Sequence, residues 1–223
     1  MYHEPVNVLV LIADIIASKK IEHRAEFQRR LKTQLAHING ASRATLLSPY
    51  TLTLGDEFQA VYGSVDSMFA DVVSIMLHVH PVQLRFAFAY GRLTTDINPN
   101  AALEMDGPAF NDARALMSTM KSESTGSIQI VAPELHSPAL ANACLKVFGN
   151  TVSRLSKNNL TIMEALMAGT ATKHIAERLA VTPRAVNKAI AGHSLATFVE
   201  LSRALTREFR AELPFSLPAG DDP

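Results

Sequence analysis

The 223-residue chain contains one cysteine, Cys144, and no tryptophan. A single cysteine excludes a disulfide within the chain and a cysteine-rich zinc site, and it fits a reducing compartment. No apolar run approaches the ~20 residues of a membrane-spanning helix. The first residues also lack the pattern of a secretory signal, because Glu4 and Pro5 precede an apolar run that stops at Asp14. We therefore expect a cytoplasmic protein without a membrane-spanning segment.

The chain also lacks net charge, since its 21 basic residues equal its 21 acidic ones, so the molecule as a whole does not attract polyanions. The charges are unevenly distributed. Residues 151–213 hold nine Lys and Arg against five Asp and Glu, whereas residues 1–150 hold twelve against fourteen. Near residue 150 the composition turns polar and the pattern becomes wholly helical. We therefore predict two domains, residues 1–150 and 151–213, followed by a disordered tail at 214–223.

Apolar periodicity predicts alternating strands and helices in the first domain. The expected strands are 6–12, a hairpin within 46–62, 82–90 and 127–132. The expected helices are 24–39, which Asn39 and Gly40 are predicted to end, then 65–80, 109–120 and 133–148. Helices that alternate with strands in this way predict an α+β fold, with a mixed sheet covered by helices.

Acidic residues fall where two of these strands meet a turn. The first strand is apolar apart from Asn7 and leads into Asp14, and Gly55, Asp56 and Glu57 connect the strands of the hairpin. An acid at the end of a buried strand is costly unless it is bound. If the strands pair side by side, Asp14 and Asp56 converge, and a divalent cation is their natural partner. Alternatively, Asp56 only shapes the turn and Asp14 only caps a helix.

The second domain shows the pattern of a helix-turn-helix. Short helices are predicted at 160–167, 172–179 and 183–190, and a turn of three residues joins the last two. Residues 172–186 resemble the helix-turn-helix of many bacterial regulators closely. The predicted DNA contacts are Thr182, which also suits an N-cap, and the outward residues Arg184, Asn187 and Lys188.

Other roles for these helices stay open. Short helix pairs also serve as dimerisation or docking units. A longer helix is predicted over residues 194–212, and its apolar stripe suits a core or a dimer contact.

Four motifs in the first domain resemble the SatD family of bacterial proteins. They are IADIIASKK at residues 12–20, TLGDEFQ at 53–59, RFAFAYG at 85–91 and DGPAFNDAR at 106–114. The same blocks are similar, more distantly, to class III nucleotidyl cyclases and to GGDEF domains, which share a ferredoxin-like core. The resemblance therefore implies a ferredoxin-like, nucleotidyl cyclase-like mixed sheet with helices, followed by an all-α helix-turn-helix domain.

The cyclase likeness implies a nucleotide bound together with Mg or Mn. It implies that Asp14, Asp56 and the backbone carbonyl of Ile15 are metal ligands, with Glu57 as a further ligand. Metals in such sites neutralise a triphosphate and lower the pKa of the attacking hydroxyl.

The same likeness implies that Asn111 and Arg114 act on the ribose and the transferring phosphate, and that Lys19 contacts the nucleotide. Two departures from the cyclase pattern stand out. Asn111 and Arg114 are three residues apart rather than four, and the position of the lysine that reads the purine falls near Leu52, so the base is undetermined. Cyclase sites form between two subunits, which implies a homodimer.

Three functions follow from these observations. The preferred hypothesis is a DNA-binding regulator whose cyclase-like domain binds a nucleotide with a divalent metal, so that the ligand alters DNA affinity. The first alternative is an active metal-dependent nucleotidyl cyclase or nucleotidyltransferase, in which Arg114 stabilises the transition state. The second alternative is a non-catalytic scaffold whose acidic residues are structural.

Overall fold

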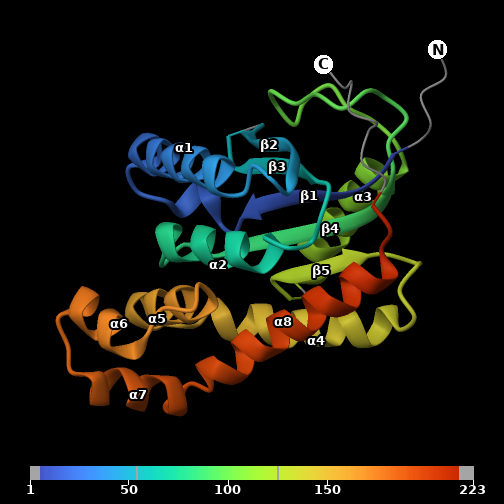
Figure 1. Cartoon of the computed structure of the whole chain (residues 1–223). Coiled ribbons are helices and arrows are strands. Elements are labelled where there is room, and N and C mark those ends of the chain that lie inside the picture. The colour runs from blue at the N-terminus through green and yellow to red at the C-terminus, as the bar shows by residue number, and fades with distance from the viewer. Residues whose placement is uncertain (1–5, 54, 125, 216–223) are drawn as a thin grey trace, which may run out of the picture.

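The computed structural model describes residues 6–53, 55–124 and 126–215. Within them, a five-stranded sheet carries helices on both faces (Figure 1). The strands are β1 (Asn7–Ile15), β2 (Leu46–Leu52), β3 (Glu57–Tyr62), β4 (Leu84–Arg92) and β5 (Ile128–Val131). The helices are the 3-10 helix η1 (Ser18–Lys20) and the α-helices α1 (Arg24–Ala41), α2 (Met68–Val79), α3 (Pro108–Glu123), α4 (Pro138–Val152), α5 (Lys157–Met167), α6 (Thr172–Leu179), α7 (Pro183–Gly192) and α8 (Leu195–Glu212).

The sheet has the order β2-β3-β1-β4-β5. Strand β1 lies antiparallel between β3 and β4, and β5 is parallel to β4. The elements from β1 to β4 therefore follow the β-α-β-β-α-β ferredoxin-like arrangement, with β5 added at one edge. The prediction of an α+β fold with a mixed sheet is confirmed.

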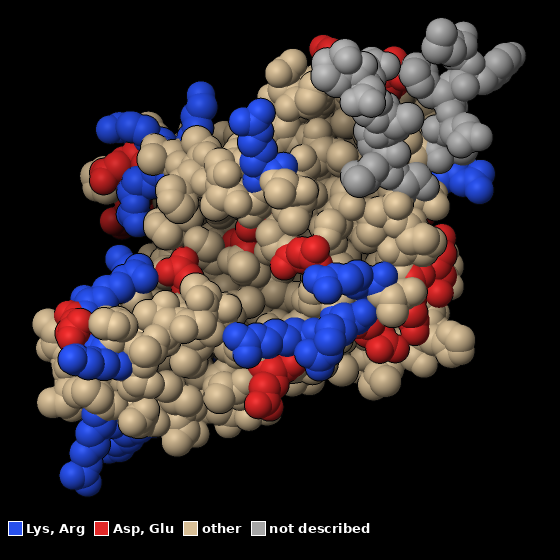
Figure 2. Space-filling model, in the orientation of Figure 1, with Lys and Arg blue, Asp and Glu red and all other residues tan. Residues whose placement is uncertain are grey.

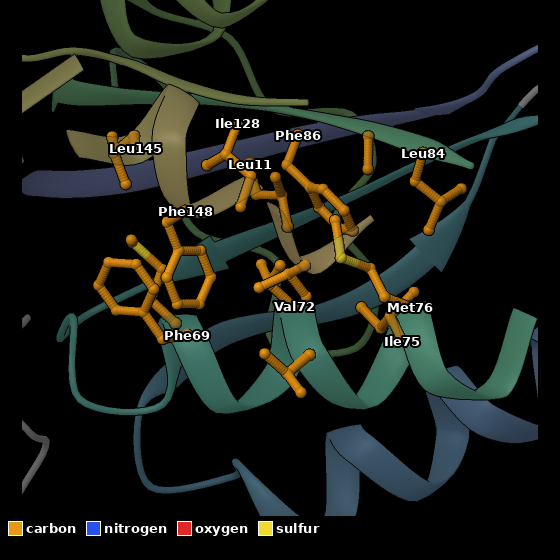
Figure 3. Close-up of a cluster of buried hydrophobic side chains, with 14 of the residues drawn as sticks. Leu11, Phe69, Val72, Ile75, Met76, Leu84, Phe86, Ile128, Leu145 and Phe148 are labelled. Atoms are coloured by element: carbon orange, nitrogen blue, oxygen red, sulfur yellow. The ribbon is translucent and has the colours of Figure 1, made fainter. Parts of the chain in front are cut away.

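Alternation along the central strand separates two apolar layers. Leu9 and Leu11 belong to the cluster of buried residues that includes α1, α2 and α4, whereas Val8 and Val10 belong to the cluster that includes α3. Successive side chains of a strand point to opposite faces, so β1 is buried on both sides. Figure 3 shows the first layer, where side chains of α2 and α4 meet those of β1, β4 and β5.

The helices after α4 pack on the α2 and α4 side of the sheet (Figure 1). Ile175, Val186 and Phe209 belong to the same cluster of buried residues as Leu11, and the ring centroids of Phe148 and Phe198 are 6.3 Å apart. The division of the chain near residue 150 stays a prediction. Among the described residues, no helix has the length and apolar character needed to cross a membrane.

Several predicted helix boundaries differ from the observed ones by two or more residues, and two of these differences have a clear physical reason. Helix α1 does not end at Asn39 and Gly40, because the Asn39 side chain bonds the backbone N–H and C=O of Tyr50 instead of ending the helix. Helix α4 begins at Pro138 rather than at residue 133, since Leu135 first forms a turn with Ala132 and a proline suits the first helical position.

The segment predicted as a disordered tail is partly described. The Tyr90 hydroxyl donates to the carbonyl of Pro214, and the Tyr90 and Phe215 ring centroids are 5.5 Å apart. The start of the tail is thus in contact with β4. The remainder of that prediction, residues 216–223, lies outside the described residues.

A buried carboxylate joins α2 to the sheet. Asp71 is 4% exposed and accepts hydrogen bonds from Ser42 Oγ at 2.6 Å, Ser67 Oγ at 2.9 Å and Tyr62 Oη at 3.0 Å. Burial disfavours the charged form and raises the pKa of Asp71 to about 6, although these hydrogen bonds act in the opposite direction.

The pH dependence of folding should report this carboxylate. Its pKa is higher in the folded chain than the ordinary value of 3.8, so the folded state binds more protons between pH 4 and pH 6. The contribution of Asp71 to the free energy of unfolding should therefore fall as pH rises through that window, by up to about 3 kcal/mol. Urea unfolding of wild type and Asp71→Asn at several pH values measures this slope, which the variant should lack. Equal slopes in both proteins would contradict the assignment.

Candidate functional site

The sheet places Asp14 in a row of charged side chains at the end of β1. The antiparallel register sets Asp14 opposite Glu57 of β3 on one side and opposite Arg85 of β4 on the other. Side chains directly opposite each other on antiparallel strands share a face of the sheet. Asp14 is 6% exposed, so its charge requires partners within the protein.

Two basic side chains provide those partners. Arg85 Nη1 lies 3.3 Å from Asp14 Oδ2, and Lys121 Nζ lies 2.9 Å from Asp14 Oδ1. The Lys121 Nζ atom is also 3.7 Å from Glu57 Oε2. We call these four residues the Asp14 cluster. With two carboxylates and two cations, its formal charge is zero.

Helix α3 positions Lys121. Its residues Phe110, Ala113, Met117 and Met120 are buried against the sheet at helical spacing. Lys121 follows the last of them, in the final turn of the helix, and its half-exposed side chain reaches the end of β1. The apolar packing of α3 therefore determines which end of the helix meets the acidic residues.

Asp56 has a different environment from Asp14. Its backbone carbonyl accepts a hydrogen bond from the N–H of Ile15 at 3.0 Å, so the turn lies beside the end of β1. Its carboxylate, however, accepts from Ser18 Oγ at 2.5 Å. Gly55 has φ of +68°, a conformation that favours glycine, and its carbonyl accepts from Gln28 Nε2 at 2.6 Å. The turn is thus held by η1 and α1.

The donor set does not fit a divalent ion as it is arranged. Both oxygens of Asp14 are in ion pairs, and the Asp56 carboxylate bonds Ser18. Across the described part of the chain, no group of three or more His, Cys, Asp or Glu residues is placed to hold a metal ion. A divalent ion requires about six oxygen ligands. The metal-ligand roles of Asp14, Ile15, Asp56 and Glu57 therefore stay predictions.

The other residues of the predicted nucleotide site are not gathered around Asp14. Asn111 and Arg114 are exposed in the first half of α3. The Arg114 guanidinium lies 3.8 Å from Asp106 Oδ1 and 5.4 Å from the centroid of the Phe110 ring. Lys121 is seven positions after Arg114, about 10 Å along a helix. Lys19 is exposed on η1. The structure of one chain therefore leaves the roles of Asn111, Arg114 and Lys19 as predictions.

Sequence reasoning missed three residues that the structure brings to the acids, namely Ser18, Arg85 and Lys121. Arg85 carried a usable signal, because it is the charged member of an alternating strand that pairs with β1. Lys121 carried a weaker signal, since its role depends on the direction in which α3 crosses the sheet.

In the helix pair at the other end of the molecule, α6 has the predicted bounds, and α7 begins at the predicted residue but ends at Gly192, two residues later than predicted. Helices α6 and α7 are joined by residues 180–182, and Thr182 Oγ1 accepts from the N–H of Ala185 at 3.2 Å, so the predicted N-cap is confirmed. Val186 is buried, whereas Arg184, Asn187 and Lys188 are exposed. The DNA contacts assigned to these residues stay predictions.

The chain is a ferredoxin-like α+β protein with a helical C-terminal part. The SatD family model matches residues 8–207, and the chain belongs to the SatD family. No curated protein matches its sequence.

Similar solved structures include cyclase domains. A bacterial light-regulated adenylyl cyclase is 18% identical with a TM-score of 0.42, over 57% of this chain and 76% of that one. The guanylate cyclase domain of RhGC from Catenaria anguillulae, solved in complex with GTP, is 17% identical with a TM-score of 0.40, over 53% of this chain and 74% of that one. A regulator of polyketide synthase expression from Bifidobacterium adolescentis is 12% identical with a TM-score of 0.25, over 92% and 86%. At these identities and scores, none of them carries an argument about activity.

The Asp14 cluster makes a prediction about stability. Arg85→Met should lower the free energy of unfolding by about 3 kcal/mol, because it leaves a buried carboxylate short of a partner. Lys121→Met should cost no more than about 1 kcal/mol, because the Lys121 side chain is 43% exposed and its pairs are screened by water. Urea unfolding of the two variants measures the difference.

The double variant Asp14→Asn/Arg85→Met provides the control. It should lose less stability than the sum of the two single variants, because each single change leaves one member of the pair unpaired. Additive losses, or equal losses in Arg85→Met and Lys121→Met, would contradict the account of the cluster.

Proposed function

We propose that this SatD-family protein is a DNA-binding regulator in which α7 enters the major groove of duplex DNA. The observation that carries the proposal is the exposure of Arg184, Asn187 and Lys188 on a helix that Val186 anchors in the core. A turn of three residues joins this helix to α6. Recognition helices of DNA-binding proteins are presented in this way, with their first turns facing the bases.

Local charge supports the proposal. Residues 172–193 hold four Lys and Arg and one Glu, in a chain whose net charge is zero. In Figure 2 basic side chains project from the end of the molecule that α6 and α7 form in Figure 1. Phosphate contacts supply most of the non-specific affinity for DNA. In a protein without net charge, the basic surface formed by α6 and α7 is therefore the one expected to contact the duplex.

Each exposed side chain of α7 has a chemical role in the proposal. Arg184, in the first turn, suits the acceptors of guanine, and Asn187 suits adenine. Lys188 suits a phosphate as a point charge. The Thr182 oxygen accepts from the backbone of α7, which leaves its hydrogen to donate to a phosphate. Two such helices in the predicted homodimer would read half-sites about one turn of DNA apart.

DNA binding should depend on the basic residues of α7. The double variant Arg184→Gln/Lys188→Gln should weaken binding to a random-sequence duplex, and the slope of log affinity against log salt should fall by about one unit, because one phosphate contact, that of Lys188, is lost. Fluorescence anisotropy over a salt series measures both quantities.

The matched control is Lys32→Gln, which removes an exposed positive charge from α1, at the opposite end of the molecule in Figure 1. It should leave affinity and salt slope unchanged.

With the wild-type protein, selection of bound sequences from a random pool of duplexes should yield a common sequence motif. Absence of binding to any duplex at low salt, or equal weakening by the control, would contradict the proposal.

A second candidate function is nucleotide binding near the Gly55 turn, and it rests on the cationic side chains around that turn. The Arg24 guanidinium lies against Gly55, with Nη2 3.1 Å from the position that a Cβ would occupy at that residue. Lys19 and Lys20 are exposed and follow Ser18, whose hydroxyl donates to Asp56. Such an arrangement suits the phosphate groups of a nucleotide. Because the Asp14 cluster is already neutral, the geometry favours binding over turnover, and the proposed binding requires no divalent metal.

Nucleotide assays separate the remaining functions. Titration calorimetry with each of the common nucleoside triphosphates should detect binding of at least one, and incubation with Mg or Mn should release no pyrophosphate. Release of pyrophosphate would favour the nucleotidyl cyclase or nucleotidyltransferase instead. No binding of any nucleotide would contradict this second function and favour the scaffold.

A further inference from the structure

The ammonium group of Lys121 lies between carboxylates from two different strands. It is 2.9 Å from Asp14 Oδ1 and 3.7 Å from Glu57 Oε2. Carboxylates that converge from neighbouring strands at the end of a sheet are the kind of site that binds a cation. In this chain a side chain of α3 provides that cation.

With Lys121 in place, the positive and negative formal charges of the site are equal, so no further cation is required. Arg85 neutralises the second oxygen of Asp14, so Lys121 is the only cation that Asp14 and Glu57 still require. A divalent ion added to the cluster would approach both an ammonium and a guanidinium within a few ångströms. Unlike charges attract and like charges repel most strongly in such a partly buried place, where water screens them poorly.

The four residues of the cluster differ in exposure, so an ion from solvent could replace the Lys121 ammonium group without disturbing the pair of Asp14 and Arg85. Arg85 and Asp14 have side-chain exposures of 15% and 9%, and the register of β1 and β4 holds them together. Lys121 and Glu57 are more accessible, at 43% and 32%. The ammonium is therefore the member of the cluster that an ion from solvent competes with.

We infer that Lys121 acts as the tethered cation of the Asp14 cluster and excludes divalent metal ions from it. Lys121 thereby decides the cation specificity of the site. The inference does not depend on DNA binding or on nucleotide binding, because it concerns the carboxylates alone.

The inference predicts that removal of the ammonium creates a metal site. The full-length Lys121→Met variant should bind Mn²⁺ about tenfold or more tightly than wild type, because the cluster then carries a net negative charge and the oxygens of Asp14 and Glu57 that paired with Lys121 have lost their cation. Electron paramagnetic resonance of free Mn²⁺ during a titration measures both dissociation constants. Circular dichroism of each variant verifies that it is folded.

Three further variants locate the effect. Lys121→Arg keeps the positive charge and should bind Mn²⁺ as weakly as wild type. Arg114→Met removes a positive charge from α3 farther from Asp14 and should not gain affinity. Glu57→Gln in the Lys121→Met background should lose the gained affinity, because it removes one of the two carboxylates.

The outcomes decide the inference in either direction. A gain in Lys121→Met alone, reversed by Glu57→Gln, supports it. Equal Mn²⁺ affinity of wild type and Lys121→Met, whether strong or undetectable, overturns it. An equal gain in Arg114→Met overturns it too, because the general charge of α3 would then be the cause.

Discussion

A buried negative charge at the end of the central strand determines the arrangement of this part of the fold. Asp14 is at the point where β1 leaves the sheet, and it is almost wholly removed from water. An unpaired carboxylate in such a place would cost several kcal/mol or more. The protein meets this requirement from two directions, with Arg85 across the sheet and Lys121 from the helix above it.

The ferredoxin-like order of strands makes that solution available. Because β1 lies between β3 and β4, one position of β1 faces a partner on each side, and the register fills these with Glu57 and Arg85. Helix α3 covers the same face and ends beside the row. The helical part that includes α7 packs on the other side of the sheet, through α2 and α4. The proposed DNA surface and the Asp14 cluster therefore belong to opposite faces of one sheet.

Much of the fold could be predicted from residue patterns, because strand alternation, helical stripes and capping residues are local. Thr182 and Pro183 located the start of α7, and the apolar stretch before Asp14 located β1. The failures arose where a long-range contact overrode a local signal. Asn39 and Gly40 read as a helix end, but Asn39 bonds the backbone of Tyr50, which lies on the next strand.

In the candidate site, too, the local features could be predicted and the long-range contacts could not. Sequence placed Asp14, Asp56 and Glu57 at one end of the sheet, which requires only the order of the strands. It did not reveal that Asp14 and Glu57 share Lys121 while Asp56 bonds Ser18, because those contacts depend on the register and on the crossing of α3. The resemblance to cyclases implied a metal beside these acids, and the structure places the ammonium group of Lys121 between Asp14 and Glu57.

The most direct measurement is the Nζ signal of Lys121 in nitrogen-detected NMR of the full-length protein, assigned by its absence in Lys121→Arg. An ammonium held between two carboxylates should exchange its protons slowly and give a distinct signal that millimolar Mg²⁺ leaves unchanged. A signal that coincides with those of the solvent-exposed lysines, or that shifts to their position when Mg²⁺ is added, would contradict the account.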